Sequence, residues 1–373
     1  MLWRRQVVRG ALVVLAAFGV GALPTGPGPR AAEAQVAAER AAPAAVAAAP
    51  AAEPAPQLVP IRFGSPQAVS DAGIFIARDR GYFQEQGFDV QSIVFQSAPN
   101  TIAPLASGDL ELAGGTFSTG LLNAIDRGIA IKAVADKGTS RPGFEFSQVI
   151  VRPDLLSSGA IRSAADLRGK RIGAASTRSG VESLIAQVVE RGGLTINDVE
   201  LVDLGYPEMV VALGNGAIDA GNLIEPTLSA AITRGVAASW EDGYSSTAYG
   251  GVYQSGTLFA ADRFLSQPDQ ARRWMVAYLR GLRDYNDAFA KNQGRADVIR
   301  ILTENTSVKD PAAYEHMNMP GLDPDGRVTR ASLQRDLDYF RRMGYYTGSV
   351  TSADQVVDTS AAEAAAAQLG PYQ

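Results

Sequence analysis

The chain contains one stretch written twice, and this repeat constrains its fold more than any other feature. Residues 97–115 recur as residues 205–223 at a constant offset of 108 positions. The matched positions of the two stretches are Pro99, Ile102, Leu105, Gly108, Glu111 and Ala113 against Pro207, Val210, Leu213, Gly216, Asp219 and Gly221. A fixed offset over so many positions predicts two related lobes, and a cleft between such lobes is a natural place for a ligand.

The N-terminal segment has the pattern of an export signal. Basic residues precede an apolar run over residues 11–23, which is too short to span a bilayer, and residues 32–34 fit the small-x-small cleavage pattern. We therefore expect a signal peptide over residues 1–34, with a membrane anchor as the alternative. Residues 35–57 are rich in Ala and Pro, a composition that predicts a disordered tether.

Composition narrows the function classes. The chain has no cysteine, which excludes disulfides, thiolate catalysis, cysteine-ligated metals and a lipid-modified N-terminal cysteine. An exported chain without a lipid anchor is expected in the periplasm. The formal net charge of −5 argues against nucleic acid as a partner.

Short strands and helices alternate along both halves, which predicts parallel sheets with right-handed crossovers. Apolar, β-branched segments at residues 146–152 and 252–260 look like hinge strands between two lobes. We expect lobe I to comprise residues 58–151 plus 254–373 and lobe II to comprise residues 152–253. The helices that the periodicity predicts after residue 268 should pack back on lobe I, with Trp274 and its aromatic neighbours in the core.

No catalytic motif is present. The nucleophile elbow, the P-loop, the dinucleotide fingerprint and the zincin motif are all absent. His316, the only histidine, has no acid or serine partner in sequence and is interpreted as a packing or surface residue. The sequence predicts neither an enzyme, nor a metal site, nor a cofactor.

A binding site is predicted where four polar loops follow strands, because ligands of such sheets lie at the carboxyl ends of the strands and next to helix N-termini. Arg178 could offer a fork of donors to a carboxylate or sulfonate. For each single hydroxyl, simple helix capping is an equal alternative. The candidate residues of these loops are Ser65, Ser70, Asp71, Gln96, Ser97, Thr116, Phe117, Ser118, Ser176, Thr177, Arg178 and Ser179.

Three aromatic residues and one acid complete the candidate set. Phe117, Tyr206 and Tyr253 could form an apolar wall against the ligand or lie in the core. Glu225, before Pro226, could accept hydrogen bonds from the ligand or close a salt bridge between the lobes. Glu111 and Asp219 are interpreted as structural, because the repeat places them identically in both lobes.

Several segments resemble the periplasmic substrate-binding proteins of ABC importers, in the branch that takes nitrate, sulfonates, taurine and thiamine pyrimidines. The segments are Ala72-Gly-Ile-Phe-Ile-Ala-Arg-Asp-Arg-Gly-Tyr-Phe-Gln-Glu-Gln-Gly-Phe-Asp-Val, Asp166-Leu-Arg-Gly-Lys-Arg-Ile-Gly, and Leu213-Gly-Asn-Gly-Ala-Ile-Asp-Ala-Gly with Glu225-Pro226. The resemblance implies a two-lobe α/β fold of the Venus-flytrap kind, type II-like, in which each lobe is a mostly parallel sheet flanked by helices.

The resemblance also implies a function. A monomer of this kind captures a small organic or inorganic anion, or a pyrimidine-like ligand, and delivers it to a membrane permease with its ATPase. It does not fix the ligand. One alternative is an exported enzyme of the thiamine-pyrimidine type, against which the lack of cysteine argues, since that relative uses a cysteine-rich iron motif. The other alternative is a ligand sensor for a receptor.

Overall fold

The computed structural model describes residues 57–95 and 98–373, all within one unit of the chain, residues 55–373. The expected signal peptide, the tether up to residue 56 and the candidate site residues Gln96 and Ser97 lie outside the described residues. Among the described helices, none combines the length and the apolar character that crossing a membrane requires.

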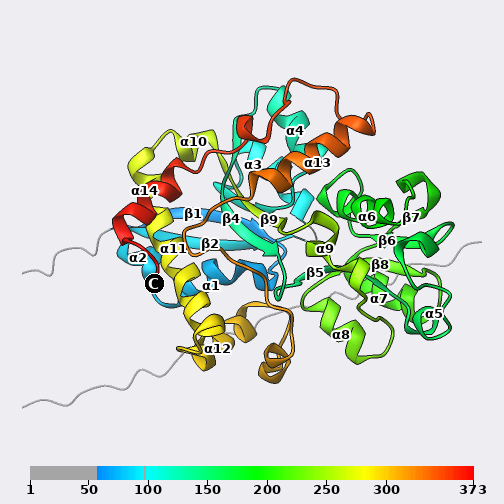
Figure 1. Ribbon diagram of the computed structural model, residues 1–373. Helices are drawn as coiled ribbons and strands as arrows, with labels where there is room; N and C mark the ends of the chain where they lie inside the picture. Colours follow the sequence, from blue (N-terminus) through cyan, green and yellow to red (C-terminus); the bar gives the residue numbers. More distant parts are fainter. Residues whose placement is uncertain (1–56, 96–97) are drawn as a thin grey trace, which may run out of the picture. The chain divides into compact units, whose positions relative to one another are not determined.

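The first sheet has five strands in the order β2-β1-β3-β9-β4 (Figure 1). Strand β1 pairs in parallel with β2 and β3, whereas β9 runs antiparallel to both of its neighbours, β3 and β4. The sheet is therefore mixed: four of its five strands run in one direction, in line with the predicted mostly parallel sheet, and β9 runs against them. Its strands are β1 (Val59–Ser65), β2 (Phe88–Val94), β3 (Leu112–Gly115), β4 (Ile131–Ser140) and β9 (Tyr253–Ala261).

The second sheet has four strands in the order β5-β8-β6-β7. Strand β6 pairs in parallel with β7 and β8, and β5 runs antiparallel to β8. Its strands are β5 (Ser147–Val151), β6 (Arg171–Ala174), β7 (Glu200–Asp203) and β8 (Ala220–Ile224).

The two sheets share one topology, which confirms the prediction of two related units. Strands β1, β2 and β3 occupy the positions that β6, β7 and β8 occupy in the second sheet, and an antiparallel strand follows next in each, β9 or β5. The repeat in the sequence spans β3 and β8, which hold equivalent places. Strand β5 pairs with β8 in the second sheet, whereas the expected boundary after residue 151 assigns it to lobe I.

Helices flank both sheets. Figure 1 shows α11 beside α1, with α2, α12 and α14 around them on the first sheet. Trp274 of α11 is buried there, as the periodicity predicts. The α-helices are α1 (Ala72–Asp79), α2 (Tyr82–Glu85), α3 (Ile102–Ser107), α4 (Thr119–Asp126), α5 (Pro153–Ser157), α6 (Gly180–Arg191), α7 (Tyr206–Gly214), α8 (Thr227–Thr233), α9 (Ser245–Tyr249), α10 (Asp262–Leu265), α11 (Pro268–Ala290), α12 (Arg295–Asn305), α13 (Arg330–Arg342) and α14 (Ser360–Leu369).

Helix α13 contacts β9 of the first sheet and also α6, which follows strand β6 of the second sheet. Tyr339 of α13 donates a hydrogen bond at 2.7 Å to the carboxylate of Glu182, which belongs to α6. Phe340 stacks on Phe117 with ring centroids 6.2 Å apart. One hydrophobic cluster therefore continues from the first sheet through α13 to α6.

Candidate functional site

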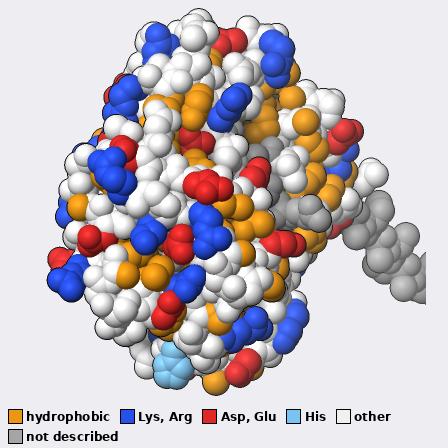
Figure 2. Space-filling view, turned by 90° about the vertical axis from the view of Figure 1, so that its right-hand side faces the viewer, with side chains coloured by type: hydrophobic (Ala, Val, Ile, Leu, Met, Phe, Trp, Pro, Cys, Tyr) orange, Lys and Arg blue, Asp and Glu red, His pale blue; other side chains and the backbone are white. Residues whose placement is uncertain are grey.

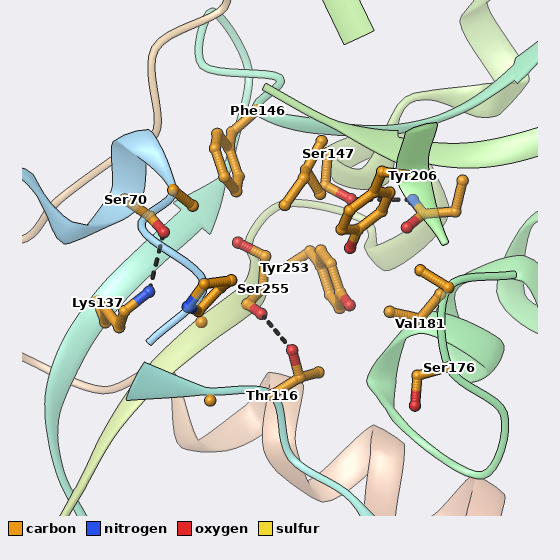
Figure 3. Close-up of a pocket in the computed structure, with 17 residues that line it drawn as sticks. Ser70, Thr116, Lys137, Phe146, Ser147, Ser176, Val181, Tyr206, Tyr253 and Ser255 are labelled. Atoms are coloured by element: carbon orange, nitrogen blue, oxygen red, sulfur yellow. Dashed lines mark hydrogen bonds between the residues drawn. The ribbon is translucent and has the colours of Figure 1, made fainter. Parts of the chain in front are cut away.

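A cavity lies where the carboxyl ends of strands from both sheets meet (Figure 3). Its volume is about 60 Å³. One water needs roughly 10–15 Å³ of such space, so the cavity as it stands has room for a small solute only. The lining residues are Pro66, Ala68, Ser70, Gly115, Thr116, Lys137, Phe146, Ser147, Ala175, Ser176, Val181, Tyr206, Asn222, Ile224, Tyr253, Ser255 and Gly256.

Among the described residues that line the cavity, Lys137 is the only charged one. Its ammonium group donates to Ser70 Oγ at 3.1 Å and lies 2.8 Å from Asp71 Oδ1. The second oxygen of Asp71 accepts a hydrogen bond from the backbone N–H of Ala68 at 2.9 Å. Burying an ammonium group without a partner would be costly, and Asp71 supplies that partner.

Glycines make room for this ion pair. A Cβ atom on Gly114, in β3, would lie 2.1 Å from Cε of Lys137, so the lysine stem passes directly over this position. A Cβ atom on Gly138 would lie 3.1 Å from Cβ of Ser70. The absence of side chains at these two positions lets Lys137 and Ser70 meet at the cavity wall.

Two hydroxyl groups lie on the floor between β3 and β9. Thr116 donates to the backbone oxygen of Ser255 at 3.3 Å, and the Ser255 hydroxyl donates to the carbonyl of Gly138 at 2.9 Å (Figure 3). Both hydroxyl groups can still accept hydrogen bonds from a ligand.

The second sheet contributes Asn222 from β8, Ser147 from β5 and Ser176 after β6. The Asn222 amide group donates to Ser147 Oγ at 3.0 Å and to the carbonyl of Gln148 at 3.1 Å. Its Oδ1 atom is buried and has no hydrogen-bond partner among the described residues. Ser176 directs its hydroxyl to the backbone oxygen of Thr177 at 3.4 Å.

Three aromatic rings wall the cavity: Phe146, Tyr206 and Tyr253. Tyr253 donates to the carbonyl of Gly180 at 3.0 Å, and burial raises its pKa well above the usual value. Tyr206 is the first residue of α7 and turns its hydroxyl toward the cavity, as Figure 3 shows. Burial raises the pKa of Tyr206 as well, so both hydroxyls are neutral donors at physiological pH.

The structure brings five of the sequence-predicted site residues to the cavity. They come from three of the four predicted loops and from the aromatic set: Ser70, Thr116, Ser176, Tyr206 and Tyr253. Asp71 lies directly behind them through its ion pair with Lys137. Ser65 is buried next to the cavity and accepts from the N–H of Gln67 at 3.2 Å.

Ser118 and Ser179 prove to be helix caps, the alternative reading of these hydroxyls. Ser118 accepts from the N–H of Leu121 at the start of α4, and Ser179 accepts from the N–H of Val181 at the start of α6. The same two serines form a bridge between the loops that precede the two helices. They hold these loops together beside the cavity without lining it. By contrast, Asp71, the residue before α1, makes no capping hydrogen bond to that helix through its side chain.

Arg178 and Thr177, which the sequence predicts as part of an anion site, do not line the cavity. Both side chains are exposed, and the Arg178 guanidinium lies 5.2 Å from the ring centroid of Tyr345. Arg178 has a positive φ of 52°, and its backbone N–H donates to Glu182 at 2.8 Å. This turn directs the side chain away from the cavity. Phe117, expected as an aromatic wall, is likewise in the core against Phe340.

Glu225 takes neither of the two roles considered for it. Its carboxylate accepts from Ser229 Oγ at 2.7 Å and from the backbone N–H of Asn318 at 3.0 Å. Burial raises the pKa of Glu225, while these hydrogen bonds lower it and offset part of the effect. Glu225 therefore ties β8 to the chain near residue 318 by hydrogen bonds, without a salt bridge and without lining the cavity.

Sequence reasoning missed the two polar side chains that the cavity presents from inside strands, Lys137 and Asn222. The repeat held a signal for Asn222, because its counterpart 108 positions earlier is Gly114 and the two residue types differ in chemistry. Lys137 lies inside β4 and had no such signal. Among the described residues, no cluster of three or more His, Asp or Glu could hold a metal ion.

Comparison with known proteins gives a family. A model of the family described as NMT1/THI5 like matches residues 69–290. A putative aliphatic sulfonates-binding protein of Bacillus subtilis is 27% identical over 227 residues, which make up 60% of this chain and 64% of that protein. A putative binding protein of Brucella abortus is 24% identical over 213 residues, 57% of this chain and 62% of that protein. The matches thus span less than two thirds of these relatives.

Solved structures share the fold. An alkanesulfonate-binding protein of Xanthomonas axonopodis pv. citri, bound to MOPS, superposes with a TM-score of 0.62 at 22% identity, over 82% of this chain and 98% of that one. The nitrate-binding protein of Synechocystis PCC 6803 superposes with a TM-score of 0.66 at 16% identity, over 85% of this chain and 90% of that one. A desulfurization enzyme superposes with a TM-score of 0.55 at 15% identity, over 83% of this chain and 100% of that one. The predicted periplasmic-binding-protein fold is confirmed.

Proposed function

The chain belongs to the NMT1/THI5-like family, and from this premise we propose that it is the solute-binding component of an ABC importer. The observation that carries the proposal is the cavity, whose polar and aromatic walls come from both sheets. A small solute in this cavity would contact Ser70, Thr116 and Lys137 on one side and Ser176, Tyr206 and Asn222 on the other. The names of the matched curated relatives, which are binding proteins, support the same role.

Binding on two sides gives the ligand a means to act on conformation. A ligand that contacts both lobes favours the state in which the lobes are closed, in proportion to its differential affinity for that state. A permease can then distinguish the loaded protein from the empty one. The lobes themselves, residues 58–146 plus 252–373 and residues 147–251, are part of this proposal.

Capture outside the cytoplasmic membrane is the second part of the proposal. The N-terminal sequence supports export, and a loaded monomer would pass its ligand to a permease with an attached ATPase. The distribution of charged side chains on the surface agrees with a protein that is dissolved outside the membrane. Figure 2 shows Lys and Arg side chains interspersed with Asp and Glu on the face in view, without a broad basic patch of the kind that binds nucleic acid.

Binding without turnover is the third part. The described residues that line the cavity include no His, Cys, Asp or Glu. Ser70 and Lys137 are within hydrogen-bond distance, but Lys137 donates to Ser70 and pairs with Asp71. In this arrangement the lysine serves as a hydrogen-bond donor to Ser70 and as the partner of Asp71.

The fold shared with a desulfurization enzyme makes an exported enzyme the second candidate. One experiment separates the two. Protein purified from its source is examined by native mass spectrometry, and the retained ligand is identified after release. Recovery of the same compound unchanged after prolonged incubation supports a binding protein, and its conversion into a product supports an enzyme.

The binding role itself is tested with a panel of small acids, sulfonates and pyrimidines in thermal unfolding. A cognate solute at a hundred times its Kd should stabilise the folded protein by about 2.7 kcal/mol. If no compound stabilises the protein and the protein from its source retains no ligand, the proposal is wrong.

A further inference from the structure

The carboxamide of Asn222 is an unusual feature of the cavity wall. The side chain is completely buried, and its Nδ2 atom makes both of the group's hydrogen bonds, to Ser147 and Gln148. Its Oδ1 atom has no partner among the described residues. A buried acceptor without a partner costs folding stability, so native proteins rarely keep one without a reason.

The orientation of this carboxamide is fixed by chemistry. The two atoms of an amide group are easily exchanged, but the backbone carbonyl of Gln148 can only accept a hydrogen bond. The atom that faces Gln148 must therefore be the NH₂ group. The oxygen is the atom left without a partner, on a residue that lines the cavity, and only a donor can satisfy it.

At the equivalent position of the repeat, the first sheet has a donor where the second sheet has this acceptor. Asn222 in β8 corresponds to Gly114 in β3, and the space above Gly114 is taken by the stem of Lys137. The first sheet thus presents an ammonium group from this position, whereas the second sheet presents a carbonyl oxygen. The cavity is chemically two-sided although its scaffold is duplicated.

The charge of Lys137 is already balanced by Asp71 at 2.8 Å. An inorganic anion in the cavity would meet a neutral ion pair on one side and the Asn222 acceptor on the other. A ligand that carries its own donor avoids this mismatch, since one end of it can accept from Lys137 while the other end donates to Asn222.

We propose that the ligand is a small nitrogen compound that bears an N–H donor for Asn222 Oδ1 and a carbonyl, carboxylate or sulfonate oxygen for Lys137. The inference rests on the proposed binding function and sharpens it. Oxyanions and simple alkanesulfonates without an N–H group are expected to bind weakly.

The test uses pairs of compounds that differ mainly in the donor: 2-aminoethanesulfonate against ethanesulfonate, β-alanine against propionate, and uracil against 1,3-dimethyluracil. Isothermal titration calorimetry measures each with the full mature chain. We expect the N–H member of at least one pair to bind at least tenfold more tightly. In Asn222→Ala this preference should disappear, while the affinity for the donor-free member changes less than threefold.

Thr257→Val is the matched control. Thr257 Oγ1 is also buried and finds no hydrogen-bond partner in the described part of the chain, but Thr257 does not line the cavity. The variant should keep the preference for the N–H compound. A second variant, Asn222→Ser, covers the case in which Asn222→Ala does not fold, and it should also lose the preference.

Three outcomes would overturn the inference. Equal affinity within every pair that binds, or a preference that persists in folded Asn222 variants, contradicts the ligand class and leaves the binding function standing. If no compound binds and the protein purified from its source carries no small molecule, the binding function fails and the inference fails with it.

Discussion

Lys137 Nζ lies 2.8 Å from Asp71 Oδ1, and the two side chains are 4% and 0% exposed. The pair joins β4 to the turn before α1 and places an ammonium group at the wall of the cavity. Breaking a buried pair by removing one partner is strongly destabilising, whereas replacing both partners is often close to neutral. The effects of Lys137 on ligand affinity and on folding stability can therefore be measured separately, with a single and a double variant of this pair.

The first prediction concerns Lys137→Met. The variant should lose at least about tenfold in affinity for the cognate solute, because a charged donor is lost, and about 3 kcal/mol of folding stability, because Asp71 is left buried and unpaired. The double variant Asp71→Asn with Lys137→Met should regain most of the stability and none of the affinity. Calorimetry and urea unfolding measure the two effects. Wild-type affinity in the double variant would show that Lys137 does not contact the ligand.

The second prediction concerns Gly114→Ala. The new Cβ atom would approach Lys137 Cε to 2.1 Å, so the lysine must move away from its present place. Affinity should fall by about tenfold, and the free energy of unfolding should fall by up to about 3 kcal/mol, as in Lys137→Met, because a displaced lysine leaves Asp71 buried and unpaired. Gly120→Ala in α4 is the control, because a Cβ there meets nothing closer than 3.7 Å. A loss of affinity in the control would point to a general effect of the substitution.

The third prediction separates two residues of one loop. Ser176 lines the cavity, and Arg178 does not. Ser176→Ala should weaken binding by about 3- to 10-fold, as expected for the loss of one hydrogen bond. Arg178→Ala should leave affinity within twofold. Titration calorimetry on both variants decides, and the opposite pattern would return the anion site to Arg178, where the sequence alone had placed it.

The fourth prediction concerns pH. Burial raises the pKa of Asp336 to about 7, against the hydrogen bonds from Tyr249 and Ser183 that lower it. The folded chain therefore keeps this proton between about pH 4 and pH 7, where the unfolded chain releases it. The folding stability that the Asp336 proton contributes is fully present below about pH 4 and is lost as the pH rises through about 7.

Asp336→Asn removes this titration and keeps an acceptor for Tyr249. Between pH 5 and pH 8 the wild type should lose about 1–3 kcal/mol of free energy of unfolding that the variant keeps. The difference between the variant and the wild type should therefore grow by this amount. Urea unfolding at the two pH values measures the difference. Asp338→Asn, at an exposed position of the same helix, should show no such gain. Parallel curves for wild type and Asp336→Asn would contradict the account.

The fifth prediction concerns the repeated acids, interpreted from the sequence as structural. Glu111 accepts from the backbone N–H of Arg62 at 2.8 Å, and Asp219 accepts from the backbone N–H of Arg171 at 2.9 Å. Both arginines also donate to the carbonyl oxygens of the repeated glycines, Gly108 and Gly216. Glu111→Ala and Asp219→Ala should each cost about 1–3 kcal/mol in urea unfolding without changing affinity. A change in affinity alone would contradict a structural role.

The scaffold could be predicted because the repeat and the hydrophobic periodicity can be detected within short stretches of the sequence. The step of 108 residues located β3 and β8 in equivalent places, and the periodicity after residue 268 predicted the helices found there, the first of which is α11, Pro268–Ala290. Short helices such as α9 and α10 escaped, because four or five residues carry too little periodicity to detect.

The chemistry of the site was less predictable, because it depends on side chains that long-range pairing brings together. Lys137 and Ser70 are far apart in the chain and meet only because β4 lies beside the turn that follows β1. Arg178 follows a strand as a site residue should, yet its positive φ and the ring of Tyr345 direct it elsewhere. Backbone conformation at a single loop residue is beyond what pattern reasoning can reach.

The central claim is that one small solute binds in the cavity between the two sheets. Native mass spectrometry of the protein purified from its source tests it most directly. The account predicts a one-to-one complex with a compound that contains nitrogen, and its absence from the double variant Asp71→Asn with Lys137→Met. A bare protein mass for wild type, or equal retention of the compound by that variant, would contradict it.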